Sequence, residues 1–282
     1  MGATALARAA DDAAIDYPFT ARDLERVRAL IHRHAGIALN PGKRHMVYGR
    51  LARRLRALAL GDFATYLDRL EARPAHDPEW QEFVNALTTN LTAFFREPHH
   101  FPILARHLAA RAGRGAPRLW CCAASTGEAA YSMALTALDT LGDAAPAILA
   151  SDIDTRVLAV AREGVYREEA LSGLDAALRR RWFLRGRAGK AGLVRVRAEL
   201  RERVDFLQLN LTDAQWPIEG RFDAVFCRNV MIYFDRPTQA RLLARLAERL
   251  APGGLLFAGH SENLAHAGQL FEPLGRTVYR RR

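Results

Sequence analysis

Four short polar segments each follow an apolar run in the C-terminal part of the sequence. They are Ser125 to Glu128, Ser151 to Asp154, Asn210 to Asp213 and Arg228-Asn229. The runs before them have the length of buried strands, and the ligands of an open parallel sheet bind beyond the carboxyl ends of its strands. One such segment is ordinary polarity at a strand end, whereas four in order predict a site for a ligand that contains adenosine.

The residue types in these segments suit the parts of such a ligand. The turn that ends at Gly127 has small residues, which let a ligand approach the backbone and the free N–H groups of the helix that follows. Asp152 and Asp154 suit hydrogen bonds to ribose hydroxyls, although either residue is also a natural helix cap. Asn210 offers an amide and Leu211 an apolar contact for a purine ring.

The elements that must position these segments change in kind along the chain. Residues 16–85 have helical apolar periodicity interrupted by turn signals, which predicts an all-helical domain. Farther on, short apolar runs alternate with helical patterns, which predicts a parallel sheet covered on both faces. The predicted strands are residues 119–123, 147–150, 204–209, 222–227 and 255–258. An arginine-rich insertion at residues 165–200, with a loop at 186–192, interrupts this alternation.

The composition is that of a globular protein with a basic net charge. Of the 282 residues, 50% are hydrophobic and 26% are charged, and the formal net charge is +10. No apolar run reaches the roughly 20 residues that span a bilayer. Residues 1–15 lack the apolar core of a secretory signal, so we expect a disordered tail and a cytoplasmic protein. The charge favours an anionic partner, without choosing among a nucleic acid, a membrane surface and an acidic protein.

The cysteines and histidines do not have the spacing of a metal site. No Cys-x-x-Cys pair occurs, so we expect no metal. Packing and turn hydrogen bonds are the better prediction for His99, His100 and His260 than metal binding or base catalysis. The cysteines lie in apolar runs and are expected to be buried; they are Cys121, Cys122 and Cys227.

Longer segments of the sequence resemble one family. They are Thr88 to Glu97 (TTNLTAFFRE), Ser125 to Glu128, Ser151 to Thr155 (SDIDT), Phe222 to Phe234 (FDAVFCRNVMIYF) and Gly259 to Asn263 (GHSEN). In this order they resemble CheR, the chemotaxis receptor methyltransferase family, and the likeness extends from about residue 19 to residue 279. One departure is Ala129-Ala130, where the family usually has Glu-Pro. It leaves Glu128 in place, so we expect altered cofactor affinity at most.

The resemblance implies an α/β fold: a Rossmann-like S-adenosylmethionine methyltransferase domain with a small β-subdomain insertion, preceded by an all-α N-terminal domain. The implied domains are residues 16–85 (helical), 86–97 (a linker contributing to the cofactor site) and 98–282 (methyltransferase, with the β-subdomain at 165–200). The implied cofactor is S-adenosyl-L-methionine, which leaves as S-adenosyl-L-homocysteine. The implied cofactor-binding residues are Asn90, Thr92, Arg96, Glu128, Asp154, Asn210, Leu211, Arg228 and Asn229.

The resemblance also implies the reaction, in which glutamate side chains of chemotaxis receptors become methyl esters for sensory adaptation. A free glutamate carboxyl has a pKa of about 4.3, so it is ionised at pH 7 and needs no base. Catalysis then reduces to placing oxygen, methyl and sulfur in line. Arg96 and Tyr233 are the expected catalytic residues: Arg96 would orient the acceptor carboxylate and Tyr233 would wall the path of the methyl group.

Two surfaces are expected to meet the receptor. Arg50, Arg53 and Arg54 share an arc of about 100° on a predicted helix. This arc is a solvated face by default and, by the resemblance, a docking face for acidic receptor helices. In some family members the β-subdomain also docks a receptor tail peptide. The expected partner is therefore the cytoplasmic helical region of methyl-accepting chemotaxis receptors, with the enzyme recruited to membrane receptor arrays but not inserted in the membrane.

Two other functions are compatible with parts of the sequence. A nucleic-acid methyltransferase would suit the basic charge, but amine methylation commonly uses an Asp/Asn-Pro-Pro-aromatic motif where this chain has Arg228-Asn229-Val230-Met231. No RNA-binding motif is apparent either, so we expect no nucleic-acid partner. A noncatalytic module that senses S-adenosylmethionine or tethers to receptors is left open by Ala129 and Ala130. The retained residues Asn90, Arg96 and Tyr233 argue against it.

Overall fold

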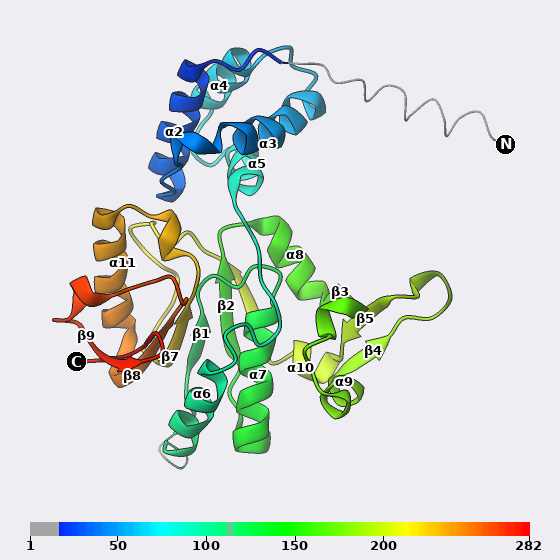
Figure 1. Cartoon of the computed structure of the whole chain (residues 1–282), viewed down its shortest axis with the longest axis vertical. Coiled ribbons are helices and arrows are strands. Elements are labelled where there is room, and N and C mark those ends of the chain that lie inside the picture. Colours follow the sequence, from blue (N-terminus) through cyan, green and yellow to red (C-terminus); the bar gives the residue numbers. More distant parts are fainter. Residues whose placement is uncertain (1–16, 112, 114) are drawn as a thin grey trace. The chain divides into compact units, whose positions relative to one another are not determined.

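The computed structural model describes residues 17–111, 113 and 115–282. The chain divides into two compact units, one of Met1–His34 and Leu39–Leu87, the other of Ala35–Ala38 and Thr88–Arg282 (Figure 1). The second unit thus takes up the chain again at Thr88, within the segment that we expected to link two domains. The tail predicted for residues 1–15 lies outside the described residues.

The first unit is made of helices, and local capping sets the start of two of them. They are α2 (Ala21–Ala35), α3 (Arg44–Ala57), α4 (Phe63–Glu71) and α5 (Pro78–Leu87), with a 3-10 turn η1 (Pro41–Lys43). At the start of α2 the Asp23 N–H donates to Thr20 Oγ1 at 3.1 Å, and the Thr20 N–H donates to Asp23 Oδ2 at 2.9 Å. Asp62 caps α4 by accepting the Thr65 N–H at 2.7 Å. Both helix starts are therefore set by contacts between residues three positions apart.

The described part of the second unit is built on a seven-stranded sheet with the order β6-β2-β1-β7-β8-β10-β9. Its strands are β1 (Leu119–Cys121), β2 (Ile148–Asp152), β6 (Val204–Gln208), β7 (Phe222–Cys227), β8 (Leu250–Ala258), β9 (Phe271–Gly275) and β10 (Val278–Arg281). The strands from β6 to β8 pair in parallel, as predicted, but β10 pairs antiparallel with β8 and β9. The sheet is therefore mixed: the five predicted strands are parallel, and the two antiparallel strands at this edge were not predicted. The edge strand β9 contains Pro273 and β10 is rich in arginine, so neither has the apolar run of a buried strand.

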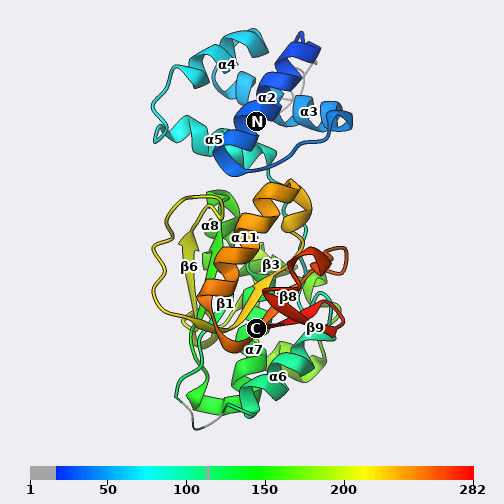
Figure 2. The same ribbon diagram turned by 90° about the vertical axis from the view of Figure 1, so that its left-hand side faces the viewer.

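Helices cover both faces of this sheet, and β1 shows how the two faces are divided. Leu119 and Cys121 belong to the core on one face, whereas Trp120 and Cys122 belong to the core on the other. Helices α6 (His100–Ala109) and α7 (Glu128–Leu141) pack on the first face, and α11 (Arg236–Arg249) packs on the second (Figure 2). The remaining helices are α8 (Thr155–Glu163), which contacts β2 and β6, and the short α10 (Ala198–Arg201).

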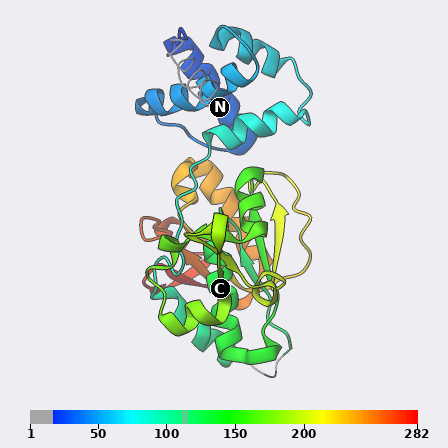
Figure 3. The ribbon, with the colours of Figure 1, turned by 90° about the vertical axis from the view of Figure 1, so that its right-hand side faces the viewer.

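The insertion between α8 and β6 forms the small β-subdomain that the resemblance implied (Figure 3). Its described strands β3 (Val165–Arg167), β4 (Phe183–Arg185) and β5 (Leu193–Val196) make an antiparallel sheet with the order β3-β5-β4. Helix α9 (Ala176–Trp182) precedes β4, and the loop after β4 contains a 3-10 turn, η4 (Ala188–Lys190). Other 3-10 turns are η2 (Gly142–Ala144), η3 (Glu168–Leu171), η5 (Met231–Tyr233) and η6 (Ala265–Ala267).

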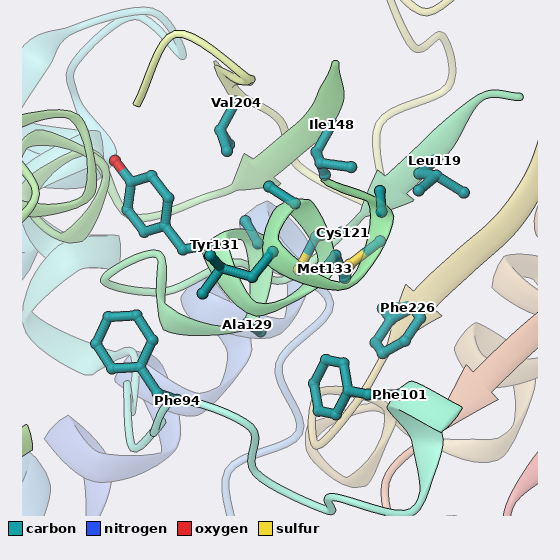
Figure 4. Packing of buried hydrophobic residues seen from close by; sticks show 14 of the residues in the cluster. Phe94, Phe101, Leu119, Cys121, Ala129, Tyr131, Met133, Ile148, Val204 and Phe226 are labelled. Carbon is teal, nitrogen blue, oxygen red and sulfur yellow. The ribbon is translucent and has the colours of Figure 1, made fainter. Parts of the chain in front are cut away.

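The core of the first face surrounds α7 (Figure 4). Tyr131 and Met133 of this helix are fully buried in the cluster that also contains Phe94 of the segment before α6. Ala129 and Ala130 are 6% and 0% exposed and belong to the same cluster. The two alanines that depart from the family's usual pattern are thus core residues.

Among the described residues, no helix has both the length and the apolar character that a membrane span requires.

Candidate active site

The segment Thr88–Glu97 runs past the carboxyl ends of several strands and is held there by hydrogen bonds. Thr88 Oγ1 and Asn90 Nδ2 donate to Oδ2 of Asp154, just after β2, at 2.6 and 2.8 Å. The carbonyl of Asn90 accepts a hydrogen bond from Ser125 Oγ, after β1, at 3.0 Å. These contacts place Asn90 beside two of the polar segments that the sequence predicted to form one site.

Asp154 uses both carboxylate oxygens within the protein. Its Oδ1 accepts the N–H groups of Arg156 and Val157 at the start of α8, at 2.9 and 3.3 Å. Its Oδ2 accepts from Thr88 and Asn90. A carboxylate has about four acceptor positions, and all are used here. Asp154 is therefore a helix cap, and a ribose hydroxyl bound to it would share Oδ2 with the two donors of the linker.

Asp152 fixes the turn after β1. It is 8% exposed, and its Oδ2 accepts the Ser125 N–H at 2.8 Å while its Oδ1 accepts the Asp154 N–H at 3.0 Å. Burial raises the pKa of the Asp152 carboxyl to about 6, although the hydrogen bonds from backbone N–H groups oppose this shift. Its two contacts hold the ends of β1 and β2 together at the site.

The start of α7 presents backbone N–H groups to the site. Gly127 is the N-cap there, with a φ of +99°, and it has no side chain that could cap the helix. A Cβ at this position would lie 2.9 Å from Ala161 Cβ and 3.1 Å from Tyr166 Oη. The next residue, Glu128, is 7% exposed and accepts from Thr126 Oγ1 at 2.7 Å, and its burial raises its pKa. Free N–H groups beside a buried carboxylate suit a ligand with both a carboxylate and an amino group.

Arg228 joins the linker to the end of β7. Its guanidinium donates to the carbonyl of Arg96 and lies 3.7 Å from Glu97 Oε2. It also lies over the rings of Phe226 and Phe101, 5.2 and 5.8 Å from their centroids. Burial lowers the pKa of Arg228, which is 9% exposed. Arg228 was expected from the sequence to bind the cofactor. The structure shows that it also makes contacts within the protein, to the linker and to two phenylalanine rings.

Glu97 links the same cluster to the end of β8. Its Oε1 accepts the His260 N–H at 2.9 Å, and its Oε2 faces Arg228 and, at 3.5 Å, His100 Nδ1. Burial raises the pKa of Glu97, but the His260 N–H and the charge of Arg228 outweigh it, so the pKa lies below its usual range. Burial lowers the pKa of His100 to about 4. At neutral pH the pair is thus a carboxylate beside a neutral imidazole.

Strained backbone gathers at this edge of the sheet. Among the described non-glycine residues with positive φ are Phe95 at +49°, Glu97 at +57°, Ser125 at +50° and Asn229 at +56°. Such positions cost about 1–3 kcal/mol each and persist where the surrounding contacts determine them, as they do at functional sites. Two of the four lie in the linker, one after β1 and one after β7, so the strain marks the same place as the polar segments.

The two expected catalytic residues lie in the linker and in the turn after β7. The Arg96 guanidinium donates to the carbonyl of Leu91 at 2.8 Å, and its own carbonyl accepts from Arg228. Tyr233 is half-buried at the end of η5, and its carbonyl accepts the Ala38 N–H at 2.7 Å. Arg96 is thus held by both its side chain and its backbone, and Tyr233 is held through its backbone carbonyl.

The remaining predicted cofactor residues have simpler surroundings. Thr92 is half-buried in the linker. Asn210 closes a turn after β6, with its Oδ1 accepting the Thr212 N–H at 3.0 Å. Leu211 is 7% exposed and supplies apolar surface. These positions are compatible with the adenine contacts that the sequence suggested.

Sequence reasoning missed one residue of the site. Glu262, in the Gly259–Asn263 segment after β8, is 5% exposed and accepts backbone N–H groups from the loop after β7. A glutamate in the turn after a buried strand, within a segment that contains glycine, serine and asparagine, was the available signal. The hydrogen bonds of Glu262 go to a loop that is distant in the sequence, since Asn229 lies 33 residues before Glu262.

The arginines expected to form one docking face have different surroundings in the first unit. Arg54 pairs with Glu79, and their side chains are 16% and 8% exposed. Glu79 also accepts from Tyr66 Oη at 3.0 Å. Arg50 donates to the carbonyl of Leu87 at 2.9 Å, whereas Arg53 is exposed. The three arginines lie on one helix, α3, as predicted. The Arg54 side chain, however, forms an ion pair with a buried glutamate of its own unit.

The cysteines are buried, as predicted, and none of the three is in a disulfide. Burial raises the pKa of the Cys121 thiol to about 12, so it is no nucleophile at neutral pH. His100 packs against the ring of Phe257, and its Nε2 lies 3.1 Å from the Arg276 carbonyl. In the part of the chain that the structure describes, no group of three histidine, cysteine or acidic side chains is placed to hold a metal ion.

Comparison with known proteins accounts for both units. Residues 90–280 match the CheR methyltransferase SAM-binding domain, and residues 22–88 match the CheR methyltransferase all-alpha domain. The chain is 54% identical over 264 residues to the chemotaxis protein methyltransferase of Klebsiella aerogenes, covering 93% of this chain and 90% of that protein. It is 53% identical to chemotaxis protein methyltransferase 2 of Pseudomonas aeruginosa, covering 94% of each. It is 55% identical to the chemotaxis protein methyltransferase of Escherichia coli, covering 90% of this chain and 88% of that protein.

A sheet whose parallel strands end at one polar edge, within residues that match a SAM-binding domain, defines an S-adenosylmethionine-dependent methyltransferase. With both domains matched and relatives more than half identical along most of their length, the chain belongs to the CheR methyltransferase family. The family resemblance found in the sequence is thereby confirmed.

The residues at the carboxyl edge fit S-adenosylmethionine. The uncapped start of α7 and the buried Glu128 suit the amino-acid part of the cofactor. Buried carboxylates, Glu128 and Asp152 among them, favour a cation such as the sulfonium. Leu211 offers apolar surface to the adenine ring.

Proposed function

We propose that this chain transfers the methyl group of S-adenosylmethionine to glutamate side-chain carboxylates of chemotaxis receptors, forming glutamate methyl esters for sensory adaptation. The observation that carries the proposal is that both CheR domains match in a chain 54% identical to a chemotaxis protein methyltransferase. The product retained after transfer would be S-adenosyl-L-homocysteine. With chemotaxis receptors as the acceptor, we also expect a cytoplasmic enzyme that is recruited to receptor arrays.

A glutamate acceptor needs no group of the protein to generate the nucleophile. A glutamate carboxylate is already ionised at pH 7. The bound cofactor supplies the activated methyl group on its sulfonium. The protein has to hold the two partners in line, which is catalysis by proximity and orientation. In this proposal Arg96 orients the acceptor carboxylate through its guanidinium, a geometry that suits a planar carboxylate. Tyr233 bounds the path of the methyl group.

The proposed cofactor residues divide into two kinds. Glu128, Asn210, Leu211 and Asn229 are assigned to direct contact with the cofactor. Asn90, Thr92, Arg96, Asp154 and Arg228 lie in or against the linker, and the hydrogen bonds of Asn90, Asp154 and Arg228 hold that linker on the sheet. In the proposal, cofactor binding therefore orders the linker and the strand ends together.

The receptor surfaces are proposed from exposure and edge geometry. Arg53 is the exposed member of the arginine set on α3 and is assigned to acidic receptor helices, with Arg50 beside it. Strand β4 lies at an edge of the β-subdomain sheet, where a receptor tail peptide can add a strand through backbone hydrogen bonds. Neither surface requires insertion into the membrane.

The test is to treat the cytoplasmic fragment of a chemoreceptor with the enzyme and S-adenosylmethionine and to locate the added methyl group by tandem mass spectrometry. The proposal predicts methyl groups on glutamate side chains. Methylation of other residue types, or of nucleic acid in a parallel reaction, would contradict it. Cofactor binding without transfer to a correctly paired receptor would favour the noncatalytic module instead.

A further inference from the structure

Glu262 is a buried carboxylate that the reaction itself does not use. It is 5% exposed and lies in the turn after β8. Its Oε1 accepts the N–H groups of Val230 and Met231 at 2.9 and 2.8 Å. Its Oε2 accepts the N–H groups of Asn229 and Gly259 at 3.0 and 2.5 Å. One side chain thus satisfies three consecutive N–H groups of the loop after β7 and one of the turn after β8.

The loop after β7 has a conformation that needs such support. Asn229 has a φ of +56°, which non-glycine residues seldom adopt. Val230 precedes the turn η5 and its side chain makes no capping hydrogen bond. The N–H groups of residues 230 and 231 at the start of this turn are donors that would otherwise be left unsatisfied. Glu262 supplies the acceptors from outside the loop.

The turn after β8 is fitted closely against the same loop. A Cβ on Gly259 would lie 2.3 Å from Asn229 Nδ2 and 2.8 Å from Asn229 N. A glycine at this position allows the two loops to touch, and Glu262 fixes their distance through hydrogen bonds to both. The two loops are therefore joined through one side chain.

We propose that Glu262 is a positioning residue for methyl transfer, because its hydrogen bonds to residues 229–231 set the places of Asn229 and Tyr233. Asn229 is held directly, through its own N–H. Tyr233 is held through η5, whose backbone begins at Met231 and closes with the Tyr233 N–H donating to the Val230 carbonyl at 3.1 Å. The inference rests on the proposed function for the roles of these two residues.

A carboxylate is needed at this position because it only accepts hydrogen bonds. In Glu262→Gln an NH2 group would replace one carboxylate oxygen. This NH2 group would face backbone N–H groups of the loop, which are also donors, so those N–H groups would lose their acceptor. The side chain keeps its length and shape, so packing is nearly unchanged. A matched control is Glu272→Gln on β9, where the glutamate side chain is 45% exposed and pairs with Arg280.

The experiment compares both variants with the wild type in S-adenosyl-L-homocysteine binding, thermal unfolding and methyl transfer to a receptor fragment at saturating cofactor. For Glu262→Gln, kcat is expected to fall between about tenfold and about a hundredfold, the loss that a misplacement of order 1 Å causes. Glu272→Gln is expected to behave as wild type. Unchanged kcat and unchanged cofactor affinity in a folded Glu262→Gln protein would overturn the inference.

A double-mutant cycle with Tyr233→Phe separates positioning from general destabilisation. If Glu262 acts by placing Tyr233, the two changes together reduce kcat by less than the product of their separate effects. A product of independent effects, with cofactor affinity unaltered, would show that Glu262 acts on neither Asn229 nor Tyr233. Conditions well below the unfolding temperature of each variant keep the fraction unfolded out of the comparison.

A second variant keeps the inference testable if Glu262→Gln does not fold. Gly259→Ala retains the carboxylate but drives a Cβ against Asn229, so it should lower cofactor affinity and kcat in the same direction. Wild-type values in Gly259→Ala would overturn the inference. If the wild type itself methylates no receptor fragment, the proposed function fails, whereas the effect of both variants on S-adenosyl-L-homocysteine binding still tests the inference.

Discussion

The Asn90 side-chain amide donates to Asp154 Oδ2 at 2.8 Å, joining residues 64 positions apart in the chain. Through this contact the linker before α6 reaches the end of β2 and the start of α8. The contact matters for function because Asp154 was expected from the sequence to bind the cofactor, and its oxygens are already shared between a helix cap and the linker.

The first prediction concerns this contact. Asn90→Ala removes one hydrogen bond to a carboxylate, worth on the order of 1 kcal/mol, and should weaken S-adenosyl-L-homocysteine binding about fivefold. Isothermal titration measures the change. Leu91→Ala, in the same segment with a side chain 80% exposed, serves as the control and should bind nearly as the wild type does. Equal affinity of wild type and Asn90→Ala would show that the contact does not support the cofactor site.

A second prediction concerns the turn before α7. Gly127→Ala places a Cβ 2.9 Å from Ala161 Cβ at a φ of +99°, so the chain must shift or unfold. The free energy of unfolding should fall by more than about 1 kcal/mol, and cofactor binding should weaken as well. Gly61→Ala is the matched control, since a Cβ there meets nothing within 4 Å. Denaturant titration of both proteins compares them, and similar midpoints would contradict the account of this turn.

A third prediction separates two neighbouring arginines of α3. Arg54→Ala leaves Glu79 buried without its partner and should lower the free energy of unfolding by roughly 3 kcal/mol. Arg53→Glu should leave stability and cofactor binding nearly unchanged but reduce methylation of a receptor fragment, because Arg53 is exposed.

The control for the receptor effect is Arg69→Glu, which reverses an exposed charge on α4 of the same unit. A loss of receptor methylation in Arg69→Glu equal to that in Arg53→Glu would mean that net charge, rather than a docking face on α3, governs the interaction. Full activity in Arg53→Glu would remove this arginine from the receptor surface.

A fourth prediction concerns acid stability. Burial lowers the pKa of His100 to about 4 from an ordinary value of 6.5, with the charge of Arg228 acting in the same direction. Between these values the unfolded chain takes up a proton that the folded chain does not. The stability conferred by neutral His100 is therefore full above pH 6.5 and is lost as the pH falls toward 4.

His100→Gln should remove this share of the acid sensitivity. Urea unfolding midpoints measured across the same pH window should fall less steeply in the variant than in the wild type. His45→Gln, which changes an exposed histidine on α3, should keep the wild-type slope. Glu97 also titrates beside His100, so a residual slope is expected in the variant. An unchanged slope in His100→Gln would contradict the assignment.

Local features of the fold were predictable from the sequence because they depend on near neighbours. The capping box of Thr20 and Asp23 and the cap by Asp62 are short-range contacts within three residues. The five central strands were found from their apolar runs. The β-subdomain followed from the family resemblance rather than from the residues alone.

Features that depend on distant contacts were harder to predict. Arg54 looks like a solvated arginine in the sequence, and its partner Glu79 lies 25 residues away. Edge strands β9 and β10 lack the apolar run that marks a buried strand. In the sequence, nothing distinguishes Glu262 from the polar residues beside it. Its importance becomes visible only in the structure, where the loop after β7 donates hydrogen bonds to it. The polar segments at the strand ends were found correctly, but their bonds to the linker were not.

The most direct test of the central claim is methyl transfer from radiolabelled S-adenosylmethionine to the cytoplasmic fragment of a chemoreceptor, followed by treatment with alkali. Carboxyl methyl esters hydrolyse in alkali, so the account predicts that the label leaves the receptor as volatile methanol. Label that remains on the receptor after alkali would mean that the acceptor is not a carboxylate, and would contradict the account.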